Sequence, residues 1–379
     1  MKKTAWVCFF LLLLLPGLLY AQRRTVQPYW YTLEQGKRYF RNGAYGDALR
    51  AFEEARRDRE AMYARMERTM IELLSVPEVR RLGDSLEQVE AYIADRNRYE
   101  AAAALKELYY RIPKESLGNS AKKVLEELDR LKAYPEAEYW IGEVYRLEGE
   151  TLIALGQYEK ALARQDLLET PGFNVEILYK TAELLRLRRN YPEMEKRLLE
   201  IIEGNGPDGR PRDFLWTGGG GSPARNAMAR TLETQGMGRF LTLYRYADPV
   251  VERAHRLLGF YYYAAGRHIP AADHLMFAFL MQTSTLIDEV LKHRFDYTFT
   301  SLDALIDEAA RRPAMSSYMA EAEYYKTMYY LGAALYGSLK VNAAREFWTF
   351  TAGRAAGPWK GRSELQLRSP FVERALERP

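Results

Sequence analysis

Cysteine is almost absent from this chain of 379 residues. The single cysteine, Cys8, lies in an apolar leader that we expect to be removed. It is also too early, and too deep in the apolar run, to become a lipidated first residue. The mature chain would then have no cysteine, which excludes disulfides, thiolate nucleophiles and cysteine metal sites.

The chain also lacks a large excess of charge of either sign. The chain has 55 Lys and Arg against 51 Asp and Glu, a formal charge of +4. Short basic runs such as Arg56–Arg57 and Arg311–Arg312 stand among carboxylates and read as solvated helix faces. So small a surplus gives no electrostatic case for binding nucleic acid, and we expect no nucleic-acid partner.

Strand-forming Val, Ile and Thr are sparse, whereas Ala, Leu, Glu, Arg and Lys dominate and Tyr is unusually common at 28. Hydrophobic residues make up 47% of the chain, enough for a sizeable core. The composition predicts an all-α fold, as two or three domains or one long helical solenoid.

Long hydrophobic runs are lacking outside the first 21 residues. There, Lys2 and Lys3 precede an apolar run from Ala5 to Leu15, a Pro-Gly break and Ala21. This order is typical of a signal peptide cleaved after Ala21, and the run is shorter than the roughly 20 residues of a spanning helix. The sequence predicts export, to the periplasm in a cell with two membranes. The alternative is an uncleaved anchor, which would be the chain's only membrane contact.

What the chain does have is a repeated spacing of small and large residues. Each stretch begins with Gly or Ala, and an aromatic residue or Leu follows three positions later. A small or unbranched residue lies nine positions after that one, and a larger residue lies a further four positions on. The five stretches are Gly36–Tyr39–Ala48–Phe52, Gly149–Leu152–Ala161–Gln165, Ala182–Leu185–Met194–Leu198, Gly259–Tyr262–Ala271–Leu275 and Gly332–Leu335–Ala344–Trp348. The spacing predicts antiparallel helix pairs that pack through small residues.

These stretches resemble the tetratricopeptide repeat, whose pattern is Trp-x2-Leu-Gly-x2-Tyr followed by Ala in units of about 34 residues. The best matches are His255–Leu258–Gly259–Tyr262–Ala271, Met328–Leu331–Gly332–Leu335–Ala344 and Gly36–Tyr39–Ala48–Phe52–Ala55. The resemblance implies a solenoid of stacked helix pairs. The irregular spacing of the units implies inserted and elongated helices.

The predicted segments follow from this pattern. They are a signal peptide at 1–21, N-terminal helical repeats at 22–203, a Gly/Pro-rich break with a degenerate helix pair at 204–248, C-terminal helical repeats at 249–353, and a tail with a short helix at 354–379. A very long helix is expected from Asp47 to about Ser75, a turn at 155–158, a separate helix at 285–293 and a final helix from Pro370.

In the resembling family the first helix of each unit lines the binding groove. Carried over to this chain, the candidate partner-binding residues are Arg253, Arg256, Phe260, Tyr263, Lys326, Tyr329 and Tyr336. Tyr with Arg or Lys suits a peptide or a carboxylate-bearing partner. The alternative is that many of these side chains pack between units.

Other patterns give no catalytic, metal or cofactor site. His268 and His274 are six residues apart, the wrong relation for two ligands on one helix face, and His255 and His293 are isolated. The four glycines of 218–221 lack the Lys-Ser/Thr of a phosphate loop. We therefore expect a non-catalytic exported scaffold that binds a protein or peptide in the cell envelope. The alternative is a small-molecule-binding or transporter accessory protein with a Tyr/Arg-lined pocket.

Overall fold

The computed structural model describes residues 27–74, 83–95, 97–111, 114–204, 216 and 223–372, and every regular element in these ranges is a helix. The prediction of an all-α fold is confirmed for this part of the chain. The expected leader with Cys8, the glycines of 218–221 and the end of the tail lie outside it. Contacts divide the chain into two compact units, one up to Thr170 and one from Pro171 onward.

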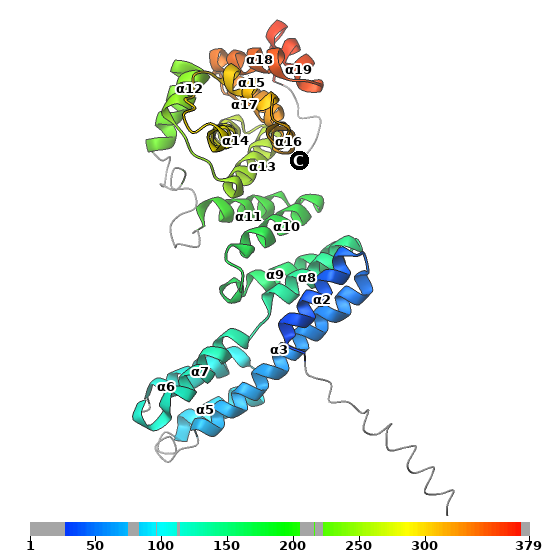
Figure 1. Cartoon of the computed structure of the whole chain (residues 1–379), viewed down its shortest axis with the longest axis vertical. Helices are drawn as coiled ribbons and strands as arrows, with labels where there is room; N and C mark the ends of the chain where they lie inside the picture. The colour runs from blue at the N-terminus through cyan, green and yellow to red at the C-terminus, as the bar shows by residue number, and fades with distance from the viewer. Residues whose placement is uncertain are drawn as a thin grey trace, which may run out of the picture. The chain divides into compact units, whose positions relative to one another are not determined.

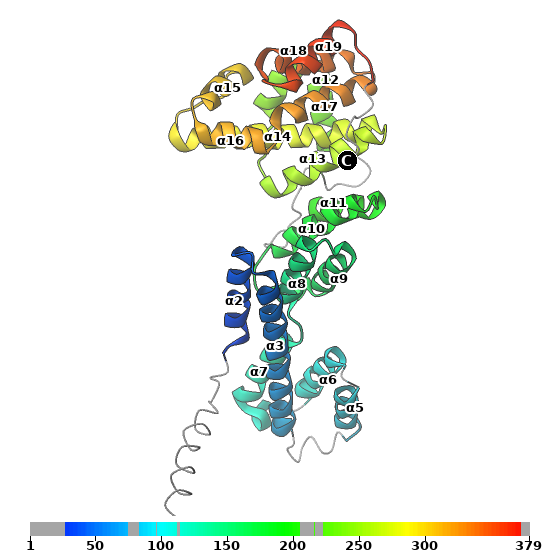
Figure 2. The ribbon, with the colours of Figure 1, turned by 90° about the vertical axis from the view of Figure 1, so that its right-hand side faces the viewer.

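Unit 1 is organised around one long helix (Figure 1). Its elements are α2 (Tyr29–Arg41), α3 (Tyr45–Leu74), α5 (Gly83–Ala94), α6 (Arg98–Arg111), α7 (Lys114–Leu131), α8 (Pro135–Leu147), α9 (Thr151–Leu162) and the 3-10 turn η1 (Gln165–Leu167). The first part of α3 packs against α2 and α8, and its later part packs against α7 (Figure 2). The long helix predicted after Asp47 is confirmed.

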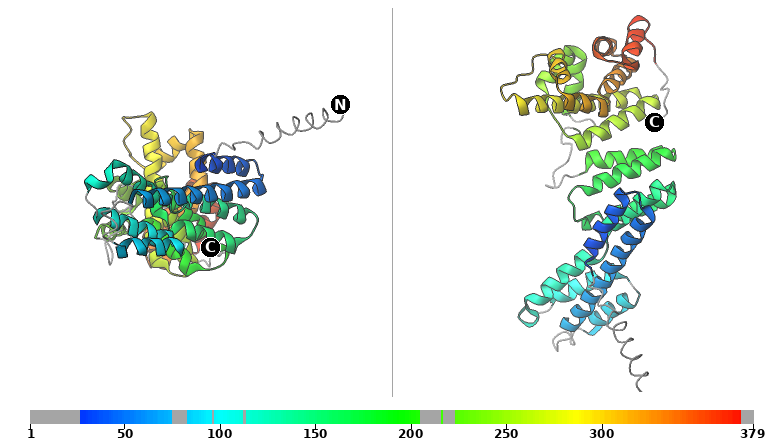
Figure 3. Two further views of the ribbon diagram at one scale, coloured as in Figure 1. Left: turned by 90° about the horizontal axis from the view of Figure 1, so that it is seen from below. Right: turned by 45° about the vertical axis from the view of Figure 1, so that its right-hand side comes forward.

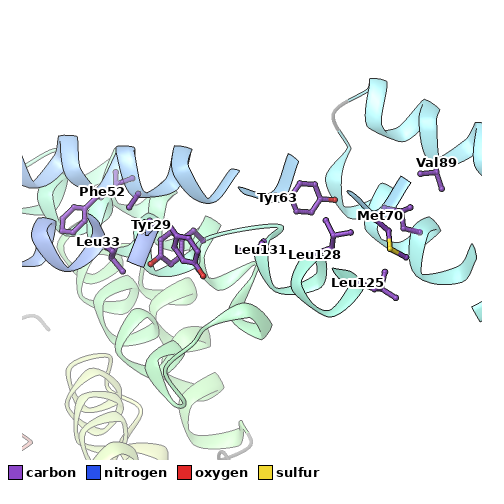
Figure 4. Close-up of a cluster of buried hydrophobic side chains, with 14 of the residues drawn as sticks. Tyr29, Leu33, Phe52, Tyr63, Met70, Val89, Leu125, Leu128 and Leu131 are labelled. Carbon is purple, nitrogen blue, oxygen red and sulfur yellow. The ribbon is translucent and has the colours of Figure 1, made fainter. Parts of the chain in front are cut away.

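The core of unit 1 follows α3 along its length (Figure 4). Phe52, Tyr63 and Met70, on one side of this helix, are all 1% exposed or less. Leu125, Leu128 and Leu131 of α7 belong to the same cluster. Burying each such side chain contributes about 1.5–3 kcal/mol, so the elongated helix is held by apolar contacts from end to end.

Glycines allow close approach within the helix pairs. An added Cβ at Gly36 would lie 2.5 Å from Phe52 Cε1, and one at Gly259 would lie 2.5 Å from Leu275 Cγ. An added Cβ at Gly332 would lie 2.8 Å from Trp348 Nε1. Since real Cβ atoms are not found so near other atoms, each partner ring or branch occupies the space that glycine leaves open. The predicted contacts at these three places are confirmed.

The second of the five stretches was placed wrongly. The glycine that contacts the facing helix is Gly142, whose added Cβ would lie 2.7 Å from Tyr158 Cε1. Gly149 instead forms the turn between α8 and α9, with φ +84°, a backbone conformation that favours glycine. The predicted turn at 155–158 therefore lies inside α9. Gly149 fitted the repeated spacing because it lies seven residues after Gly142, and residues seven apart have almost the same helical phase.

Unit 2 contains further helix pairs. Its elements are α10 (Phe173–Leu187), α11 (Tyr191–Glu203), α12 (Pro223–Leu243), α13 (Pro249–Ala264), α14 (His268–His293), α15 (Leu302–Ala310), α16 (Pro313–Glu321), α17 (Tyr324–Gly337), α18 (Val341–Arg354) and α19 (Pro358–Arg368). Helix α10 pairs with α11 (Figure 3), α13 with α14, and α17 with α18. Helix α14 also packs on α17, which makes it central to this unit.

Two helices of unit 2 differ from the sequence-based expectation. The separate helix predicted at 285–293 is the end of α14, in which the hydroxyls of Thr283 and Thr285 donate to the carbonyls of Phe279 and Met281. The polar stretch thus satisfies its hydroxyls inside the helix. The described tail helix, α19, begins at Pro358 and ends before Pro370.

The contact-based division also differs from the predicted segments. The chain is cut after Thr170, ahead of α10, whereas the sequence pattern suggested a break at 204–248. Within that stretch, α12 is interrupted at Gly236, with φ 82°, close to the predicted break of the degenerate pair. The Met237 N–H beside it donates to Glu346 Oε1 of α18 at 2.9 Å.

Candidate functional site

The predicted cationic residues of α13 and α17 are engaged in ion pairs. Arg253 lies 2.6 Å from Glu183. Arg256 lies 3.0 Å from Glu252 and 2.7 Å from Glu323. Lys326 lies 2.9 Å from the same Glu323. The structure therefore brings Arg256 and Lys326 together around one carboxylate, and their charges are largely balanced within unit 2.

The predicted aromatic residues lie mostly in packed surroundings. Tyr263 is 3% exposed and Tyr329 is 1% exposed. Phe260 and Tyr263 both pack edge-on against Tyr330. The Tyr336 hydroxyl donates to the carbonyl of Pro370 at 3.3 Å. These contacts match the packing alternative, and partner binding by this set stays a prediction.

Unit 2 also contains a buried histidine pair that the sequence did not suggest. Nδ1 of His255 lies 2.9 Å from Nδ1 of His274, and both side chains are at most 2% exposed. The indole of Trp216 packs on both rings, at 4.9 and 4.2 Å between centroids. Burial, and then His255, Arg225 and Arg267, lower the pKa of His274 well below its usual value. His274 is therefore neutral at pH 7 and is hydrogen-bonded to His255 in the core.

A concavity lined largely by cationic side chains lies in unit 1. It is a cavity of about 430 Å³ between α3, the start of α6, the connection from α7 to α8, and the end of α9. Its lining residues are Arg56, Arg59, Glu60, Asn97, Arg98, Tyr99, Leu131, Lys132, Ala133, Tyr134, Pro135, Glu138, Lys160, Ala163 and Arg164. Six of these are cationic and two are anionic, so we call this site the cationic cavity.

Some of these cations have carboxylate partners. Arg56 lies 3.1 Å from Glu138, and Arg98 lies 3.4 Å from Glu60. Lys132 lies 3.1 Å from Asp129, which stands outside the lining. Both carboxylates of the lining are thus already engaged by arginines of the same wall.

Two cations stand apart from these pairs. Among the described residues, Lys160 and Arg164 have no carboxylate within ion-pair distance. The guanidinium of Arg164 instead lies 3.5 Å from the centroid of the Tyr99 ring, a cation–π contact. Stacking fixes the plane of Arg164 and leaves its N–H groups pointing outward from the edge of that plane. The end of α9 thus carries two positive charges that are free to meet an anion.

The wall behind the cavity is built on Arg59. Its side chain is 1% exposed, lies 2.7 Å from Glu169, and donates to the Arg130 carbonyl at 2.6 Å. The rings of Tyr29 and Tyr134 lie 5.0 and 4.3 Å from its guanidinium carbon. This enclosure explains how a buried arginine is tolerated.

Two donors in this wall lack acceptors. Arg59 Nε and the Tyr134 hydroxyl are buried and have no hydrogen-bond partner among the described residues. Burial raises the pKa of Tyr134, so its hydroxyl remains a donor at neutral pH. Each unmet buried donor costs about 1–3 kcal/mol. An acceptor that reached them through the cavity, from a ligand or an ordered water, would recover that cost.

No local signal in the sequence marked this cavity. Arg56 and Arg57 were read together as a solvated helix face, but only Arg57 is exposed, while Arg56 lines the cavity. The residues come from five helices, α3, α6, α7, α8 and α9, and from the segments next to them. Their convergence depends on how α3 packs against α7 and α8, which no short spacing encodes.

The chain is similar in sequence to proteins whose activity is not known. No family model matches the chain. An uncharacterized protein of Treponema pallidum (strain Nichols) is 24% identical over 308 residues, covering 81% of this chain and 80% of that protein. An uncharacterized protein of Borreliella burgdorferi is 22% identical over 277 residues, covering 69% and 82%.

The crystal structure of BtubC (BKLC) from P. vanneervenii aligns with 75% of this chain and 96% of its own, at 15% identity and a TM-score of 0.29. Among the helices of the described ranges, none is long and apolar enough to cross a membrane. The chain is thus similar over most of its length to proteins of two organisms, and the functional case comes from its own site geometry.

Proposed function

We propose that this chain is a non-catalytic, exported protein of tetratricopeptide-like helix pairs that binds a protein or peptide partner in the cell envelope. The observation that carries the proposal is the cationic cavity of unit 1, in which Lys160 and Arg164 offer unbalanced charge beside the ring of Tyr99. Such a combination of charge and aromatic surface is typical of sites that recognise anionic side chains.

The repeat-like part of the proposal is supported by one recurring contact. Gly36, Gly142, Gly259 and Gly332 each face a large side chain on the next helix, and in each case the partner is 16 residues later. The partners are Phe52, Tyr158, Leu275 and Trp348. A constant offset over four helix pairs favours copies of one hairpin over unrelated helices.

A small molecule is the second candidate ligand. The cavity volume of about 430 Å³ lies within the range of about 300–1,000 Å³ that such sites occupy. The side chain of Tyr99 adds an aromatic ring to the lining beside Arg164.

Photo-crosslinking in cells that express the full chain tests the proposal. A photoreactive residue replaces Ala163, an exposed residue of the cavity lining, and a matched control replaces Leu152, which is 63% exposed on α9 and outside the lining. We expect a discrete protein adduct, identified by mass spectrometry, from position 163 and not from position 152. Equal adducts at both positions, or none at 163, would contradict partner binding here. If none forms while a small anion raises the melting temperature, the second candidate is supported instead.

A further inference from the structure

We infer that the cationic cavity takes an acidic peptide segment, whose side chains place at least two separate carboxylates against Lys160, Arg164 and the neighbouring arginines. This inference rests on the proposed partner binding and specifies the chemistry of the partner. It starts from the charge of the lining, in which six cationic residues face two carboxylates.

The two carboxylates of the lining leave the end of α9 uncompensated. Glu138 is held by Arg56 and Glu60 by Arg98. Lys160 and Arg164 have no such partner in the described chain, and an incoming carboxylate can pair with them without breaking an existing ion pair. A ligand carboxylate therefore gains a charge-assisted contact and displaces only water.

The spread of the cations favours several carboxylates over one compact oxyanion. The cationic residues lie on α3, at the start of α6, before α8 and at the end of α9, around a space of about 430 Å³. A single phosphate group is best held by donors that converge on one point, such as successive backbone N–H groups. Separated cations around a wide space instead match acidic side chains that project from different residues of a peptide.

Tyr99 adds orientation to this arrangement. Its ring lies against the flat face of Arg164, at 3.5 Å from the guanidinium carbon, so the guanidinium edge is held ready for a carboxylate. Lysine at this position would keep the charge but lose the paired N–H geometry. Arg164 is thus the residue that we expect to set the preference for carboxylates.

The cations of the site lie on other elements than the groove that the family resemblance implies, although Pro135 and Glu138 of α8 also line the cavity. That groove is lined by the first helix of each pair, here α2, α8, α10, α13 and α17. The six cations of the cavity lie on α3 and α6, in the α7–α8 connection, and at the end of α9. The cavity thus depends on the elongated helix α3 and on the helices α6 and α7.

Fluorescence anisotropy with the full chain provides the test. The probes are labelled peptides of equal length, one with alternating Glu and Ala and one in which Gln replaces Glu. The variants are Lys160→Gln with Arg164→Gln as a pair, and Arg164→Lys alone. The matched control is Arg57→Gln, which removes an exposed arginine of α3 that does not line the cavity.

We expect the Glu peptide to bind and the Gln peptide to bind at least about tenfold more weakly. The paired variant should weaken binding of the Glu peptide about tenfold or more, Arg164→Lys less, and Arg57→Gln less than about twofold. An unchanged far-ultraviolet circular dichroism spectrum and melting curve identify variants that remain folded. If the paired variant unfolds, the measurement is instead whether succinate displaces the labelled Glu peptide from the wild-type chain.

Three results would overturn the inference. One is equal binding of the Glu and Gln peptides. Another is a loss with Arg57→Gln as large as with the paired variant, which would indicate general attraction between charges. The third is stronger competition by inorganic phosphate than by succinate, which would assign the cavity to phosphate. The two proposals can also be told apart. If a protein partner still crosslinks at position 163 in the variant that lacks Lys160 and Arg164, the proposed function holds and this inference fails. Loss of both the adduct and peptide binding would remove the two together.

Discussion

The Nδ1 atoms of His255 and His274 lie 2.9 Å apart in the core of unit 2. At this distance one ring donates a proton and the other accepts it, so at least one imidazole nitrogen must remain unprotonated. Trp216 packs against both rings, Phe277 packs against His255, and Tyr262 packs against His274. The buried contact is therefore lost if both rings are protonated, and the lowered pKa of His274 makes the stability of this unit depend on pH.

The first prediction concerns this pH dependence. The pKa of His274 is lowered in the folded state, so the unfolded state binds more protons as the pH falls below about 6.5. Stability is fully present above that pH and is lost toward the lowered folded pKa, at up to about 1.4 kcal/mol per pH unit. Thermal melting between pH 7.5 and 5 should show this fall.

A comparison of variants isolates the histidine contribution. His274→Phe should flatten the melting temperature between pH 7.5 and 5, whereas His293→Gln, which removes an exposed histidine, should retain the slope. A wild-type melting temperature that is constant over this range would contradict the buried neutral pair.

The second prediction distinguishes glycines that face another helix from glycines that face open space. Gly142→Ala places a Cβ 2.7 Å from the Tyr158 ring, and we expect a loss of about 1–3 kcal/mol from overpacking. Gly156→Ala has nothing within 4 Å of its added Cβ, and should stabilise α9 by up to about 1 kcal/mol. Urea unfolding measures the change in stability of both variants. If Gly156→Ala were the more destabilising of the two, the turn predicted at 155–158 would be supported instead.

The third prediction concerns Arg256, a candidate for partner binding whose guanidinium contacts Glu252 and Glu323. Glu252 is 6% exposed and also accepts from Gln282 at 2.7 Å. Arg256→Met would leave this buried carboxylate without its cation, and we expect a loss of about 3–5 kcal/mol in unfolding free energy. The double variant with Glu252→Gln should recover part of that loss. Full stability of Arg256→Met would return Arg256 to the set of surface binding residues.

The fourth prediction concerns export. Mass spectrometry of the protein purified from its own cells should find Gln22 as the first residue, because the apolar run, the Pro-Gly break and Ala21 follow the order of a cleaved signal. Replacing Ala21 with Arg should block cleavage and leave the longer chain membrane-bound. Recovery of intact Met1 in the unaltered protein would favour the uncleaved anchor.

Much of the helical framework follows from local pattern. The long helix after Asp47 is found at Tyr45–Leu74, and three of the small–large contacts lie where the spacing put them. The error at Gly149 came from a neighbouring glycine in nearly the same helical phase, and the split of α14 came from polar residues that hydrogen-bond within the helix. Local spacing cannot separate a turn glycine from a contact glycine, because the difference depends on which helix lies opposite.

The sequence by itself determined the helical class and the small residues through which helix pairs approach, because propensity and spacing act over a few turns. Only the tertiary structure decided the sites. His255 and His274 meet because α13 and α14 pack face to face, and the neighbours Arg56 and Arg57 separate into a cavity wall and an exposed face. Arg59 meets Glu169 across 110 residues of chain because α3 runs through the core of unit 1. Such meetings are fixed by the packing of whole helices, which residue order alone does not specify.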